Sequence, residues 1–444
     1  MTRHGDDPSR RRLLVSGGTL AATAVGAVAL AGCSSSPSDD HPPIDATEDE
    51  LLAIADLERP PEPDDLPLEV TEEPIDEGID RVESLLAEIP DALEETIPNE
   101  AVRQYVEENR DRARDRLEGL ESQPEGYARL AHLVTTRRWA GEAEAAYAAA
   151  TDDRTTADLE GSLSDLETAV ATVDDELTRT GDGSEEAVVV YATAERRLDE
   201  ANRALEEAAR AGPRTSDVEL IGELADRHEW GRATLEEATY LLERQTTIGD
   251  RSFDDEFESA ASALLDDVRD RIEELPADVG DAGFELFDEP VDGTPRERLA
   301  SDLVSTARGS YENALEYSET NRLGRSVLTV LGVENDLLAI DRLRAGSDDL
   351  VLDRPDDADD VRTAKAGAVD AIESAQEESE RSALAQRRLN VILTSVGSGD
   401  RLLERDAARD ATSAAVAATA NYGLATVQAR TLLEATEWVL EELS

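Results

Sequence analysis

The chain has 444 residues, with 103 Asp and Glu against 44 Lys and Arg, so its formal net charge is −59. Proteins that bind nucleic-acid phosphates need a concentrated basic surface, which this composition lacks, so no nucleic-acid partner is expected. Aromatic residues make up only 3% of the chain, which argues against a platform that stacks sugars.

The first 32 residues have the three parts of an export leader. The leader begins with the basic run Ser9-Arg10-Arg11-Arg12-Leu13-Leu14, continues as a weakly apolar stretch, and ends at Leu30-Ala31-Gly32-Cys33. Cys33 is the only cysteine, so no disulfide can form within the chain.

This arrangement resembles a twin-arginine lipoprotein signal, whose usual form is Ser-Arg-Arg-x-Phe-Leu. Leu13 replaces the Phe, and either Arg10-Arg11 or Arg11-Arg12 can be the functional pair. The resemblance implies export in the folded state by the twin-arginine machinery, cleavage before Cys33, and lipid on that sulfur. The mature protein would then be anchored to the extracytoplasmic face of the cell membrane. The alternative is an uncleaved anchor helix.

The acidic residues are spread along the whole chain, and Lys365 is the only lysine. The pattern resembles lipoproteins of extremely halophilic archaea. Self-repulsion of this size opposes a compact fold in dilute buffer, whereas 1 M salt shortens the Debye length to about 3 Å and screens it. The alternative is an acidic protein of ordinary salt conditions that binds cations or basic partners.

Residues 33–74 form an acidic segment rich in Pro and Ser. Such a composition cannot bury a core, so we expect an extended linker that holds the body off the membrane. One short helix is expected over residues 47–57, because Thr47 can cap it and Glu50 follows three residues later.

The remainder has the apolar spacing of long helices and no run that predicts a strand. In one stretch the apolar residues alternate at spacings of four and three and share one helix face: Ala187, Tyr191, Ala194, Leu198, Ala201, Leu205 and Ala208. Ala at many facing positions lets helices approach closely, which predicts thin apolar seams. We therefore expect an all-α protein of long antiparallel helices.

Three short segments recur in the same order at nearly constant separation. Residues 80–85 resemble 270–275, residues 194–198 resemble 385–389, and residues 230–235 resemble 422–427. This recurrence predicts two tandem, duplicated helical-bundle domains. We place them at residues 75–250 and 265–444, with a connecting segment at 251–264.

An acidic loop at residues 345–360 contains candidate ligands for a hard cation, namely Asp353, Asp356 and Asp357. The loop lacks the order of residues found in an EF-hand, and an ordinary solvated loop is the alternative. The histidines His132 and His228 have no partner at ligand spacing, so a zinc site is not expected.

Two arginine pairs occupy equivalent places in the proposed copies: Arg196 with Arg197, and Arg387 with Arg388. If they face inward, they could hold an anionic solute or a lipid headgroup. The alternative is pairing with nearby glutamates at the surface.

The sequence contains no nucleophile elbow, phosphate loop, dinucleotide fingerprint or HExxH motif. The leading hypothesis is therefore a non-catalytic, membrane-anchored lipoprotein without a cofactor, which binds a protein partner or organises the cell envelope. The second is a solute- or cation-binding lipoprotein that serves a transporter, and the third is a hydrolase.

Overall fold

The computed structural model describes residues 42–63, 66–151, 153–212, 216–279, 282–287, 291–346 and 352–444. The leader residues lie outside this part of the chain: Arg10, Arg11, Arg12, Leu13, Leu14, Leu30, Ala31, Gly32 and Cys33. From Pro43 onward the described chain forms one compact unit. None of its helices is both long enough and apolar enough to cross a membrane.

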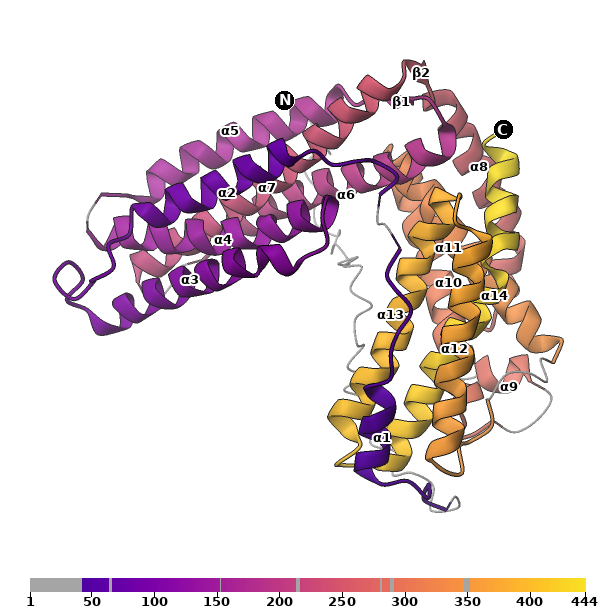
Figure 1. Ribbon diagram of the computed structural model, residues 1–444. Helices are drawn as coiled ribbons and strands as arrows, with labels where there is room; N and C mark the ends of the chain where they lie inside the picture. The colour runs from indigo at the N-terminus through magenta and orange to yellow at the C-terminus, as the bar shows by residue number, and fades with distance from the viewer. Residues whose placement is uncertain are drawn as a thin grey trace, which may run out of the picture. The chain divides into compact units, whose positions relative to one another are not determined.

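Helices make up nearly all of the regular structure, which confirms the all-α prediction (Figure 1). The first half contains α1 (Glu48–Ala55), α2 (Glu72–Ala87), α3 (Glu100–Glu118), the 3-10 turn η1 (Gly119–Ser122), α4 (Tyr127–Ala150), α5 (Thr156–Asp175), α6 (Ser184–Ala209) and α7 (Asp217–Ile248). The second half contains α8 (Asp254–Glu273), α9 (Ala282–Leu286), α10 (Pro295–Glu319), α11 (Leu323–Arg344), α12 (Ala358–Glu378), α13 (Ala383–Asp406) and α14 (Ala411–Glu442). Two-residue strands, β1 (Thr180–Gly181) and β2 (Arg251–Ser252), pair antiparallel.

The two halves repeat one packing scheme. In the first half, α4 packs on α2, α3 and α7, and α7 also packs on α5 and α6. In the second half, α11 packs on α8, α10 and α14, and α14 also packs on α12 and α13. Both closing helices, α7 and α14, have 32 residues. The described chain therefore consists of two tandem helical bundles built alike, as a duplication would produce.

Side chains that cap helix N-termini define where several of these helices begin. Ser216 accepts a hydrogen bond from the backbone N–H of Glu219 at the start of α7. Asp410 does the same for the N–H of Ser413 at the start of α14. Each cap satisfies a donor that has no partner within the helix.

Helix α6 contributes to the cores of both bundles. Its first half, including Val188 and Tyr191, is buried in a cluster with apolar residues of α8, α10 and α11. Its second half, including Leu198 and Ala201, is buried with residues of α5 and α7. The long apolar face recognised in the sequence thus spans two cores.

Part of the predicted linker, residues 33–74, is a structural element. The short helix is confirmed as α1, with the capping box between Thr47 and Glu50. The expectation that this segment buries no core is wrong, because Leu51 and Ile54 are completely buried and Leu66 is nearly so. The local excess of Pro and acid hides an apolar face that completes the core of the second bundle.

The prediction that residues 251–264 form a connecting segment is also wrong. It contains β2 and the first half of α8. Phe253, Phe257 and Leu264 are completely buried in the largest core cluster, and the two Phe rings stack with centroids 5.7 Å apart. The acidic residues between them obscured the apolar spacing.

Candidate functional site

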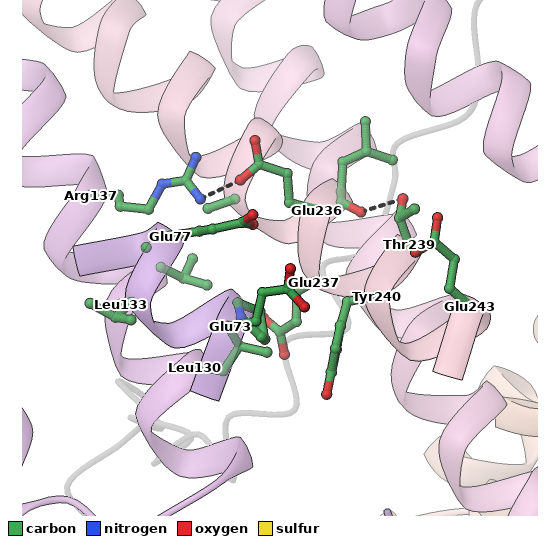
Figure 2. Close-up of a pocket in the computed structure, with 15 residues that line it drawn as sticks. Glu73, Glu77, Leu130, Leu133, Arg137, Glu236, Glu237, Thr239, Tyr240 and Glu243 are labelled. Atoms are coloured by element: carbon green, nitrogen blue, oxygen red, sulfur yellow. Dashed lines mark hydrogen bonds and ion pairs between the residues drawn. The ribbon is translucent and has the colours of Figure 1, made fainter. Parts of the chain in front are cut away.

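A cleft of about 420 Å³ lies among α2, α4 and α7 of the first bundle (Figure 2). It is lined by Glu73, Pro74, Glu77, Gly78, Leu130, Leu133, Val134, Arg137, Ala233, Leu235, Glu236, Glu237, Thr239, Tyr240 and Glu243. Three helices cooperate here because α4 packs on both α2 and α7.

The cleft has an acidic rim and an apolar floor. Glu73, Glu77, Glu236 and Glu243 are exposed, and Figure 2 shows them around the same hollow. The floor is formed by buried side chains: Leu130, Leu133, Val134, Ala233 and Leu235. Such a lining suits a group with a positive charge on an apolar stem, because the stem can be desolvated while the charge remains near carboxylates.

Arg137 is the one basic residue of the lining, and carboxylates of the same bundle neutralise it. Its Nη1 donates to Glu236 Oε2 at 2.5 Å, and its Nη2 lies 3.4 Å from Oε2 of the buried Glu229. No described residue forms an ion pair with Glu73, Glu77 or Glu243. The rim therefore keeps an uncompensated negative charge.

One wall contains Glu237, whose side chain is 1% exposed. Its Oε1 lies 2.8 Å from Nε of Arg197, which is directed inward from α6. The guanidinium of Arg197 lies over the ring of Tyr127, 5.8 Å from its centroid. Burial, and then the charge of Glu237, raise the pKa of Tyr127, so its hydroxyl stays protonated.

The arginines predicted as anion ligands are held by groups of the same chain. Arg196 donates to the Tyr127 hydroxyl at 3.3 Å. Arg388 donates to Asp336 at 2.8 Å and to Asn335 at 3.1 Å, and Arg387 is half-buried beside it on α13. Arg196 in the first bundle and Arg388 in the second thus contact different groups of the protein. That either pair binds an anion stays a prediction.

The candidate cation ligands of the acidic loop have other roles. The carboxylate of Asp357 caps α12 by accepting from the N–H groups of Asp359 and Asp360. Asp353 lies 3.2 Å from the guanidinium of Arg296. The backbone carbonyl of Asp356 accepts a hydrogen bond from the N–H of Asp45, next to an isolated parallel bridge between Asp45 and Asp357. In the described ranges, no three acidic, His or Cys side chains are arranged to hold a metal ion.

Residues 73–255 match a family model described as "Domain of unknown function (DUF8262)". Residues 254–441 match a second, "Domain of unknown function (DUF8264)". The two matched regions meet at the start of α8 and correspond to the two bundles. No curated protein and no solved structure matches the chain.

Sequence reasoning did not find the cleft, because glutamate is so frequent that no single one stands out. The useful signal would have been the combination of Glu73 and Glu77 on one turn of α2 with Glu236 and Glu243 on α7. Their convergence depends on how α2 and α7 both pack on α4, which spacing alone does not reveal.

Proposed function

We propose that this protein is a membrane-anchored, extracytoplasmic helical lipoprotein that binds a ligand and does not transform it. The leader that ends at Cys33 supports the anchor and the export route. The acidic cleft of the first bundle carries the binding role. We propose that it receives a basic side chain of an envelope partner protein, so that the lipoprotein acts as a scaffold.

The dimensions and chemistry of the cleft support this assignment. A volume of about 420 Å³ accommodates a Lys or Arg side chain and leaves room for neighbouring atoms of its backbone. The apolar floor would contact the methylene stem, and the exposed carboxylates would surround the charge. Tyr240, half-buried in the wall, adds an aromatic ring to the lining, and aromatic rings attract cations that reach their face.

A free organic cation is the second candidate ligand, which would make the protein a solute-binding lipoprotein associated with a transporter. The same rim and floor favour it, because a small quaternary amine also combines positive charge with apolar surface. The two candidate ligands differ in one respect. A basic side chain of a partner protein would also bind through the peptide backbone beside it, whereas a free organic cation has no backbone.

Calorimetric titration at molar KCl tests the cleft, with a short Arg-rich peptide and free choline as probes. We expect saturable binding of the peptide, and a variant with Glu73→Gln, Glu77→Gln and Glu243→Gln should weaken it about tenfold or more. The matched control removes the same charge from exposed positions outside the cleft, by Glu94→Gln, Glu95→Gln and Glu121→Gln together. Equal loss in both variants would show only a general charge effect, and tighter binding of choline would favour the solute-binding alternative.

Replacement of the lipidated residue tests the anchor separately. Cys33→Ser should prevent lipidation of this position, so the mass of the product changes by the missing lipid, and by the retained leader where cleavage also fails. A membrane-bound product of unaltered mass would contradict the lipoprotein assignment.

A further inference from the structure

The segment directly after the predicted anchor, residues 43–63, packs on the second bundle although the first bundle follows it in the chain. Figure 1 shows α1 beside α12 and α13, and α1 also contacts α14. We call residues 43–63 the strap. The strap therefore joins elements that are separated from it by about three hundred residues of sequence.

The strap is fixed by contacts at several points along its length. Near its start, the N–H of Ile44 donates to Thr412 Oγ1 at 3.1 Å. In the middle, Leu51 and Ile54 are completely buried in the core of the second bundle. Near its end, Gln376 donates to the carbonyl of Pro61 at 2.7 Å and Asn390 to that of Pro63 at 3.2 Å.

The only lysine of the chain holds the C-terminal end of α1. Lys365 Nζ, on α12, donates to the backbone carbonyls of Ile54, Ala55 and Leu57 at 2.8, 3.0 and 3.0 Å. These three carbonyls and the carboxylate of Asp400, 3.0 Å away, surround the ammonium group and share its three N–H donors. The last turn of α1 has no basic residue of its own, so Lys365 also supplies the positive charge that a helix C-terminus favours.

This contact explains the lysine in a chain that otherwise uses arginine. A compact ammonium on a flexible stem can direct its donors toward three converging carbonyls, whereas a planar guanidinium presents its donors in a fixed fork. The side chain of Lys365 is 1% exposed, so a larger or differently shaped side chain at this position could not turn out into solvent.

Asp400 on α13 connects the lysine to the rest of the strap. Its completely buried carboxylate lies 3.0 Å from Lys365 Nζ and accepts from the Tyr422 hydroxyl at 2.6 Å. Its other oxygen accepts from Nε of Arg59, a strap residue, at 2.7 Å. Departure of the strap would remove three acceptors from Lys365 and one donor from Asp400, so the buried pair would keep its mutual contact but lose four hydrogen bonds.

We propose that the strap is a docking device that fastens the membrane anchor to the second bundle, so the anchor stays attached to the body even when the chain after the strap is cut. The membrane consequence rests on the proposed lipid anchor at Cys33. The strap itself does not, because its contacts lie wholly within the described residues. A mechanical force applied at the anchor would then be transmitted through the strap to the second bundle. The first bundle, which contains the cleft, would not experience that force.

The test uses the full-length protein with a specific protease site inserted between Asp64 and Asp65. After cleavage, we expect the fragment from residue 65 onward to sediment with membranes at high salt. In detergent, the two fragments should co-elute on size exclusion. A variant with Leu51→Ser and Ile54→Ser should increase the released fraction about tenfold or more. Both side chains are completely buried, so the substitutions remove apolar contacts between the strap and the second bundle.

Leu57→Ser is the matched control, since Leu57 lies in the same strap but is 41% exposed, and its release should equal that of the unsubstituted protein. Release of the larger fragment from the unsubstituted protein on cleavage, both from membranes and in detergent, would overturn the strap. If the uncut protein does not sediment with membranes, the anchor proposal fails, and co-elution of the fragments in detergent alone decides the strap.

Discussion

Glu195 Oε2 on α6 accepts a hydrogen bond of 2.9 Å from the backbone N–H of Arg325, in the first turn of α11. The other oxygen lies 3.3 Å from the N–H of Gly324 and 2.7 Å from Nη2 of the buried Arg179. Glu195 therefore places a negative charge at the N-terminus of a helix in the second bundle, where the helix dipole favours an anion. This one carboxylate links an element of the first bundle to the start of α11.

Replacing Glu195 by Gln should lower the free energy of unfolding by about 1 to 3 kcal/mol, because the buried guanidinium of Arg179 then keeps only Asp254, at 3.1 Å, as a charge partner. Chemical denaturation at molar KCl measures the loss. The control is Glu206→Gln on the same helix, which removes an exposed pair with Arg210 and should cost no more than about 0.5 kcal/mol. Similar losses in both variants would show that the buried link has no special role.

Close backbone approach at the same joint predicts the effect of Gly324→Ala. A Cβ at Gly324 would lie 2.8 Å from the backbone nitrogen of Ala192 and 3.2 Å from the carbonyl carbon of Tyr191, neither of which can move without shifting α6. We expect a loss of about 1 to 3 kcal/mol in the free energy of unfolding.

Gly309→Ala is the control for this prediction. Gly309 also lies within a helix, α10, but nothing is found within 4 Å of an added Cβ. That substitution should stabilise the protein by up to about 1 kcal/mol, since Ala restricts the unfolded chain more than Gly. A stabilising effect at both positions would contradict the close approach of α6 and α11.

The sequence predicted the helices because they depend on local apolar spacing, and it predicted the tandem order because three short segments recur at nearly constant separation. The apolar alternation through Tyr191 and Leu198 identifies α6, and Thr47 with Glu50 identifies α1. What it did not predict depends on contacts across long stretches of chain. The burial of Leu51 requires the core of α12 to α14, and the cleft requires α2 and α7 to converge on α4. The sequence left open whether the arginine pairs face inward or lie at the surface, and the partners of Arg197 and Arg388, Glu237 and Asp336, are set by helix packing.

Glu229 makes the stability of the first bundle depend on pH. Burial raises its pKa, but the hydrogen bond from Arg81 and the charges of Arg137 and Arg81 outweigh burial, so its pKa is lowered overall. A carboxylate with a lowered folded-state pKa stabilises the protein above its unfolded pKa, and this contribution is lost as the pH falls through the folded pKa. The loss on Glu229→Gln should therefore be full at pH 7 and shrink below about pH 4, near the ordinary pKa of Glu. Unfolding free energies across this range measure the effect.

Asp302 supplies a comparison of opposite sign. Burial raises its pKa, and the charge of Arg298 offsets this only in part. A carboxylate with a raised folded-state pKa destabilises the protein once the pH exceeds its unfolded value, so Asp302→Asn should be neutral or stabilising at pH 7, and any gain should vanish in acid. If both variants changed with pH in the same direction, the assignment of these two environments would be wrong.

The net charge of −59 predicts a strong dependence of folding on salt. Asp and Glu outnumber Lys and Arg by more than two to one, so one-to-one pairing would leave most acidic groups without a basic partner. Lowering KCl from molar to millimolar lengthens the Debye length from about 3 Å to tens of ångströms, so carboxylates on neighbouring helices repel one another across the whole body. Far-UV circular dichroism should then show loss of helix. Sucrose in place of salt should not restore it, since sucrose does not screen charge. A spectrum that stays helical at millimolar salt would refute both the predicted salt requirement and the halophilic interpretation of the composition.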